Sequence, residues 1–216
     1  MRNLYDILTD IEKRPAMFLG NGFDLKSLDN FILGFMYGGG KLSNPKSHYP
    51  DFSLFTNWLG GMLKINSEKS AANWSWLLKE KFKDDKKTFM NFFYYLNIFK
   101  SAEPIAYIIP IKTANIDYAI NNNSSYLWCV TGNGNVNYKK NLRKINSIVI
   151  FNLNPSRTTF TLLLDKNSKV IEDRNYDMTG KILLKEIEKQ FNISLSKIKP
   201  LSAIDSIETL RKYKII

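Results

Sequence analysis

Histidine and cysteine, which many catalytic and metal centres require, are nearly absent from this chain of 216 residues. It contains one histidine, His48, and one cysteine, Cys129. A single cysteine excludes an internal disulfide bond and any zinc site built on several cysteines. A single histidine likewise excludes a site built on several histidines. We therefore expect the protein to bind no metal ion and no cofactor.

The positions of these two residues also argue against nucleophilic catalysis. His48 lies in the polar segment SNPKSHYPDF, whereas Cys129 follows Trp128 in an apolar run far along the chain. A Cys-His or Ser-His-Asp site would need His48 to act from its loop. The glycine-rich segment TGNGN (131–135) lacks the spacing of a phosphate-binding loop and is typical of a hairpin turn. We therefore expect that the protein is not an enzyme.

One histidine-free chemistry stays open as an alternative. Ribonuclease-like sites can be assembled from arginine, lysine and tyrosine side chains. Residues of these types occur in the second half of the chain, but their spacing alone does not place them together. The candidates are Tyr138, Lys139, Lys140, Arg143 and Tyr176.

Long apolar runs are also missing. No run approaches the roughly 18–20 residues that a transmembrane helix needs. The first residues, MRNLYDILTDIEKR, place Asp6 and Asp10 where a secretory signal would have its apolar core. We therefore expect a cytoplasmic protein with no membrane partner.

Positive charge is abundant and unevenly distributed. The net charge is +11, with 14 Lys and Arg against 11 Asp and Glu in residues 1–103, and 17 against 9 in residues 104–216. Such a field favours anionic partners such as nucleic acid or an acidic protein face. The alternative is that an AT-rich genome encodes lysine, asparagine and isoleucine freely.

Apolar residues at helical spacing predict five helices in the first hundred residues. The apolar stripes run over residues 4–11, 25–35, 52–62, 74–78 and 89–99. Pro15 should end the first helix, because the residue before a proline avoids the helical region. Residues 38–40, three consecutive glycines, should end the second.

The pattern changes to strands after residues 101–104. Short apolar runs predict strands over 105–111, 126–130, 148–151 and 159–164, with a hairpin return over 136–138 and a short strand at 170–171. Helices follow over 182–191 and 204–210, the last opened by Ser202. We therefore predict an α+β protein: a helical module (1–100), then a module (104–216) with an antiparallel β-sheet and C-terminal helices.

The segment IEKRPAMFLGNGFDLKSLDNFILGF (11–35) is the most distinctive part of the chain. It resembles a group of bacterial proteins with an I-x-x-R-P-x-M-[YF]-[LI]-G motif followed by L-x-x-F-I-x-G-[YF]. Later segments, F-x-x-F-x-x-W at 52–58 and W-S-W at 74–76, are similar to that group as well. The motif residues are Ile11, Arg14, Pro15, Met17, Phe18, Leu19, Gly20, Leu28, Phe31, Ile32, Gly34 and Phe35.

The group includes immunity proteins of polymorphic toxin and contact-dependent growth inhibition systems. The resemblance covers residues 1–100 and implies a protein that binds and neutralises a cognate toxin. We interpret Arg14, Pro15, Met17 and Gly20 as a structural motif. Pro15 ends a helix, Met17 and Phe18 insert into the bundle, Gly20 permits a tight turn, and the Arg14 side chain binds carbonyls freed at the helix end.

The densest basic stretch is the candidate partner-binding surface. It is Tyr138-Lys139-Lys140-Asn141-Leu142-Arg143-Lys144, to which Arg157 and Arg174 are added as a possible common face. Two functions are compatible with it. The first is an immunity protein that occludes a toxin, for example a nuclease. The alternative is a nucleic-acid-binding or nuclease-like protein that uses its basic second half.

Overall fold

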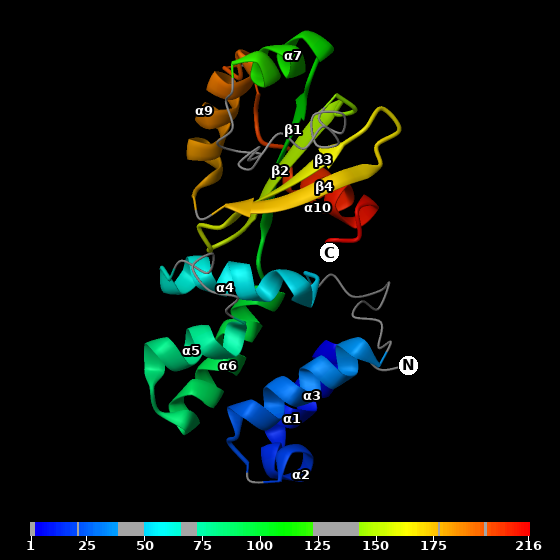
Figure 1. Cartoon of the computed structure of the whole chain (residues 1–216). Helices are drawn as coiled ribbons and strands as arrows, with labels where there is room; N and C mark the ends of the chain where they lie inside the picture. Colours follow the sequence, from blue (N-terminus) through cyan, green and yellow to red (C-terminus); the bar gives the residue numbers. More distant parts are fainter. Residues whose placement is uncertain are drawn as a thin grey trace. The chain divides into compact units, whose positions relative to one another are not determined.

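The computed structural model describes residues 3–20, 22–38, 50–65, 73–122, 143–176, 178–196 and 198–216 (Figure 1). They form two compact units: unit 1 comprises residues 1–102 with 210–216, and unit 2 comprises residues 103–209. The predicted α+β class is confirmed, since N-terminal helices precede a four-stranded antiparallel sheet and further helices. The strands predicted over 126–130 and 136–138 lie outside the described residues.

Unit 1 contains all five helices that the apolar stripes predict. Asn3 caps the first helix, where it accepts a hydrogen bond from the Asp6 amide (2.9 Å) while Asp6 accepts one from the Asn3 amide (3.2 Å). An additional short helix, α2, follows it directly. The helices are α1 (Leu4–Lys13), α2 (Pro15–Leu19), α3 (Leu25–Tyr37), the 3-10 helix η1 (Phe52–Leu54), α4 (Phe55–Leu63), α5 (Trp74–Phe82) and α6 (Asp85–Lys100).

Aromatic side chains form the core of unit 1. Phe55 is fully buried, and its ring centroid lies 5.3 Å from those of Phe52 and Phe99 and 5.7 Å from that of Phe92. The pairs with Phe92 and Phe99 are edge-to-face and the pair with Phe52 is stacked, and such aromatic pairs contribute beyond their buried area. The residues come from η1, α4 and α6, so this cluster joins helices that are distant in sequence.

Unit 2 is built on a sheet of strand order β1-β2-β3-β4, with every neighbouring pair antiparallel. The strands are β1 (Pro104–Pro110), β2 (Ser147–Leu153), β3 (Thr159–Leu164) and β4 (Val170–Tyr176). Strand β4 is longer than the sequence predicts, because its residues are polar and partly exposed at the sheet edge. Helix α7 (Thr113–Asn121) was not predicted, since only Ile116 and Ala119 of it are buried.

Helices α7 and α9 (Gly180–Phe191) bury one face of the sheet. They lie on the same side of it in Figure 1. Their buried side chains join one apolar cluster with the strands, which contains Ile109, Ile148, Ile150 and Leu163 from the sheet and Ile116, Leu183, Ile187 and Phe191 from the helices. The predicted amphipathic helix over 182–191 is thereby confirmed.

The segment before the last helix covers the outer edge of β1. The Leu201 amide donates to the Ala106 carbonyl (2.8 Å), and the Ala106 amide donates to Ser206 Oγ (3.2 Å). Ser202 opens α10 (Ala203–Lys212) as predicted, because its Oγ accepts from the Asp205 amide (3.1 Å). Covering an edge strand in this way removes a template for pairing with other chains.

Substituting Gly180 with alanine should destabilise unit 2. A Cβ at this position would lie 2.7 Å from Asn152 Oδ1, and the Asn152 amide group is held by hydrogen bonds to Thr158 O and Thr159 Oγ1 (both 2.9 Å). We expect a loss of about 1–3 kcal/mol in the free energy of unfolding, measured by urea denaturation. Lys181→Ala, at the next and exposed position, is the control and should change it by less than about 0.5 kcal/mol.

Candidate functional site

The RPAMFLG motif forms part of the protein surface. No residue of α2 is buried, and the Met17 side chain is 69% exposed. The prediction that Met17 inserts into the bundle is therefore wrong, whereas Phe18 is partly buried. Pro15 does end α1, but proline is also well tolerated in a first helical turn. It therefore starts a second helix whose five residues remain at the surface.

Arg14 and Gly20 mark the two ends of α2. The Arg14 amide donates to the Asp10 carbonyl (3.0 Å), so the backbone closes the end of α1. The Arg14 side chain is exposed and makes no hydrogen bond to a described helix carbonyl, which contradicts its predicted role. The tight turn at Gly20 is confirmed by its φ of +74°, a conformation that strongly favours glycine.

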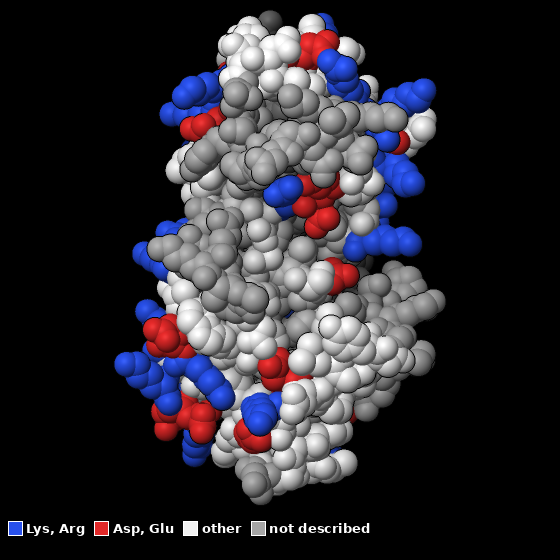
Figure 2. Space-filling model, viewed as in Figure 1, with Lys and Arg blue, Asp and Glu red and all other residues white. Residues whose placement is uncertain are grey.

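Helix α3 presents an uncharged outer face in its second half. Leu33 and Tyr37 are one helical turn apart and are 41% and 88% exposed. Gly34 lies between them, and a Cβ added to it would meet no atom within 4 Å. No charged residue occurs between Asn30 and Gly38, and Figure 2 shows mostly uncharged atoms where α3 lies. The stretch Asn30–Gly38 together with α2 is called the α2–α3 surface below.

Phe23 adds a further exposed aromatic side chain between α2 and α3. It is 41% exposed, and its ring packs edge-to-face on Phe89 of α6 with 5.5 Å between centroids. The Lys86 ammonium lies 5.2 Å from the same ring centroid. These contacts fix the segment that joins the two helices, so the connection between α2 and α3 is held against α6.

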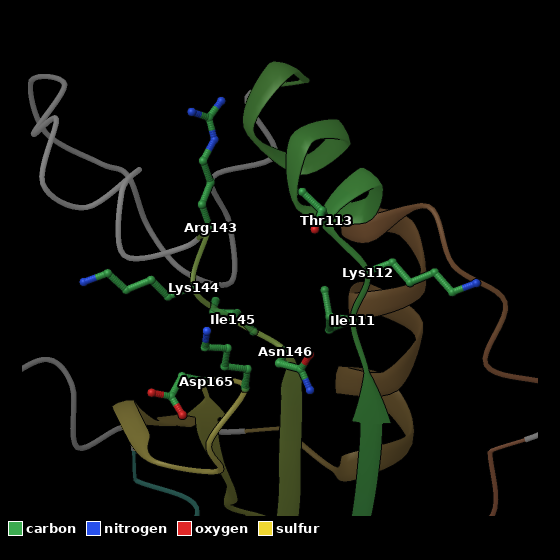
Figure 3. Close-up of a pocket in the computed structure, with 9 residues that line it drawn as sticks. Ile111, Lys112, Thr113, Arg143, Lys144, Ile145, Asn146 and Asp165 are labelled. Carbon is green, nitrogen blue, oxygen red and sulfur yellow. The ribbon is translucent and has the colours of Figure 1, made fainter.

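A basic cleft opens at one end of the sheet of unit 2 (Figure 3). It has a volume of about 590 Å³ and a floor that contains the buried residues Ile111 and Ile145. Arg143 and Lys144 stand on the segment that leads into β2, and Asp165 lies across from them. The remaining lining residues are Lys112, Thr113, Asn146 and Lys166. This set is called the basic cleft below.

The predicted partner-binding residues that the structure describes do not lie together. Arg143 and Lys144 line the basic cleft, at the end of the sheet where β2 begins. Arg157 follows the turn between β2 and β3, at the opposite end of β2, which spans seven residues or about 23 Å. They therefore do not share one patch. Tyr138, Lys139 and Lys140 lie outside the described residues.

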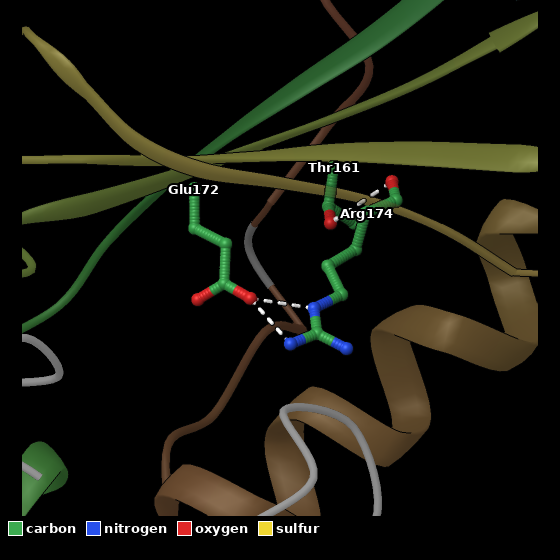
Figure 4. Close-up of polar contacts among 3 residues, drawn as sticks. All are labelled: Thr161, Glu172 and Arg174. Atoms are coloured by element: carbon green, nitrogen blue, oxygen red, sulfur yellow. Dashed lines mark hydrogen bonds and ion pairs between the residues drawn. The ribbon is translucent and has the colours of Figure 1, made fainter. Parts of the chain in front are cut away.

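Arg174 lies on β4 and is engaged within the sheet (Figure 4). Its Nε and Nη2 lie 2.6 Å and 2.5 Å from Glu172 Oε1, and its carbonyl accepts a hydrogen bond from Thr161 Oγ1 (3.4 Å). The charge of Arg174 is thus largely offset by Glu172, and its contribution to a positive surface is small.

The cleft is lined by residues that are far apart in the sequence. Lys112 follows β1, Arg143 precedes β2, and Lys166 lies in the turn between β3 and β4. Lys112 and Lys166 were not predicted as site residues, because each is an isolated lysine in a chain rich in lysine. The only sequence signal was that each follows the end of an apolar strand.

Within the described residues, no group of three or more His, Cys, Asp and Glu side chains is placed to hold a metal ion. His48 and Cys129 lie outside that part of the chain. No helix among the described residues is long and apolar enough to cross a membrane.

Comparisons with protein-family models, with curated proteins and with solved structures gave no match.

Asp24 anchors the start of α3 and gives a test of that anchor. Ser27 Oγ donates to its carboxylate (2.5 Å), as does the Lys26 amide (2.9 Å). These hydrogen bonds, that from Ser27 most strongly, lower the pKa of Asp24 below its ordinary value of 3.8. Asp24→Ala should cost about 0.5–2 kcal/mol of stability at pH 7, measured by urea denaturation.

Asp24→Asn is the matched variant, because it keeps a capping oxygen for the Lys26 amide while it removes the charge and replaces the oxygen that accepts from Ser27. A lowered pKa in the folded state stabilises the fold above the ordinary pKa, and this contribution is lost as the pH falls through the lowered value. The wild type should therefore lose stability below pH 4 relative to Asp24→Asn. Parallel pH profiles for the two proteins would contradict the assignment.

Proposed function

We propose that this protein is an immunity protein that binds a bacterial protein toxin through the α2–α3 surface and blocks the toxin by occupying it. The observation that carries the proposal is the exposure of the motif itself. The motif residue Met17 is in solvent instead of in the core, and so are two residues that are not part of the motif, Leu33 within the same segment and Tyr37 just after it. Exposed apolar side chains are candidates for an interaction surface when they form one patch.

Gly34 supports an interface at this place. A glycine within a helix costs roughly 0.5–1 kcal/mol relative to alanine. Gly34 has a helical conformation, and nothing in its own chain lies within 4 Å of the position that a Cβ would take. Packing within unit 1 therefore does not require a glycine there. A partner that approaches the helix backbone closely between Leu33 and Tyr37 does require one.

The composition of the surface fits an apolar core of a protein interface. Interface centres are depleted in charge and enriched in methionine and aromatic residues. The α3 part of the surface has no charged residue from Asn30 to Gly38, and Tyr37, with 88% exposure, is placed as an anchor. Specific complexes typically bury about 1,200–2,000 Å² in total, so residues beyond this surface would also contact the toxin.

The test takes the protein encoded by the adjacent reading frame as the candidate toxin. The two proteins are co-expressed and co-purified, the affinity is measured by titration calorimetry, and the survival of toxin-expressing cells is scored. Gly34→Ala should raise the free energy of unfolding by about 0.5–1 kcal/mol. It should nevertheless weaken the complex roughly tenfold, because an added methyl group in a packed interface costs about 1–3 kcal/mol.

Tyr37→Ala and Tyr94→Ala form a matched pair. Both remove an exposed tyrosine from unit 1, since Tyr94 on α6 is 60% exposed. Only Tyr37→Ala should weaken the complex and reduce survival. A complex that tolerates Gly34→Ala and Tyr37→Ala would rule out this surface as the interface. The absence of both binding and protection by the wild-type protein would rule out the function itself.

A further inference from the structure

The basic cleft of unit 2 is unrelated to the α2–α3 surface and has a different chemistry. Among the described residues that line it are four cationic side chains, Lys112, Arg143, Lys144 and Lys166, and one carboxylate, Asp165. The floor is apolar, while the rim is positive. We infer that this cleft binds the phosphate groups of a nucleotide or of a single-stranded nucleic acid.

Backbone pairing beyond the strand ends makes the cleft a fixed feature of the fold. The Ile111 amide donates to the Asn146 carbonyl, and the Asn146 amide donates to the Leu164 carbonyl (both 2.8 Å). These bonds hold three segments side by side: the exit of β1, the entry to β2 and the exit of β3. The basic residues on them are therefore brought together by the sheet and do not depend on chance contacts of surface side chains.

Asp165, the one carboxylate among the described lining residues, has a structural role. Asp165 Oδ1 accepts hydrogen bonds from the amides of Asn167 (2.8 Å) and Lys169 (2.9 Å), which shapes the turn between β3 and β4. Two amide donors on this oxygen disperse part of its negative charge. Asp165 thus positions the turn that carries Lys166, and it opposes a bound anion less than an unengaged carboxylate would.

Arg143 is the residue best placed to contact a phosphate. Its Nε lies 3.4 Å from Asp117 Oδ1 on α7, and its side chain is 63% exposed. The ion pair involves Nε and so orients the guanidinium group. The two terminal nitrogens carry the other four N–H donors. Figure 3 shows the side chain standing upright beside α7 at the mouth of the cleft. Forked donors of this kind match phosphate oxygens.

Helix α7 adds a smaller contribution from its first turn. The helix starts at Thr113, which lines the cleft, and the Lys112 amide just before it donates to Asn115 Oδ1 (3.2 Å). Amides at a helix N-terminus attract anions. The side chain of Lys112 points away from Arg143 and Lys144 in Figure 3, so it contributes mainly through its long-range field.

The size and lining indicate the class of ligand. A volume of about 590 Å³ is in the range of small-molecule sites. The floor offers Ile111 and Ile145 to an apolar surface such as a base, whereas no aromatic side chain among the described lining residues is available for stacking. Binding should therefore depend on phosphate contacts and show little preference for base sequence.

The experiment measures binding of the full-length protein to a fluorescein-labelled oligo(dT) by fluorescence anisotropy, and to ATP and inorganic phosphate by competition. The double variant Arg143→Gln/Lys166→Gln should weaken binding roughly tenfold or more. It should also flatten the log–log salt dependence by about 0.7 per lost contact. The control Lys181→Gln/Lys185→Gln removes the same charge from exposed positions of α9 and should change the affinity less than about twofold.

The ligands separate the two sources of phosphate. Competition by ATP at millimolar concentration supports a nucleotide site, and binding of the oligonucleotide without such competition supports a nucleic-acid site. Equal losses in both double variants would mean that the affinity reflects net charge alone, which overturns the inference. No binding of any of the three probes by the wild-type protein overturns it as well. Toxin binding through the α2–α3 surface is unaffected by either outcome.

Discussion

The burial of β2 on both of its faces is the constraint on which unit 2 depends. Ile148, Val149, Ile150 and Phe151 follow one another in the sequence, and each is at most 1% exposed. Antiparallel sheets often leave one face in water, so a strand with no exposed side requires cover on both. The same strand pairs with β1 and β3, which satisfies its backbone groups. The position of β2 in turn fixes where Arg143 and Lys144 emerge at its start.

In unit 1 the corresponding constraint is the aromatic cluster around Phe55. It engages η1, α4 and α6 through side chains that are fully or nearly fully buried. Because these helices supply the core, the core does not require the side chains of α2 or of the outer face of α3. Residues there are exposed without loss of the fold.

The two candidate surfaces differ in the forces that would act on them. The α2–α3 surface is uncharged along Asn30–Gly38, so association there would depend on apolar burial and close approach. The basic cleft is cationic and partly exposed, so binding there would depend on ionic strength. Most of the net charge of the chain falls in residues 104–216, the part that contains the cleft. The two candidate surfaces therefore differ in charge.

The sequence by itself determined the elements whose apolar pattern is strong. The stripes of α1, α3 and α6 and the runs of β1, β2 and β3 predict these elements correctly, because their periodicity reflects burial directly. Only the tertiary structure decided the elements with a weak apolar pattern, the exposure of the motif and the residues that line the cleft. Strand β4 and α7 bury few apolar side chains, and Met17 is at the surface instead of in the core. Lys166 and Arg143 line the same cleft only because the strands pair. Local pattern encodes burial, whereas proximity between distant residues depends on how the elements pack.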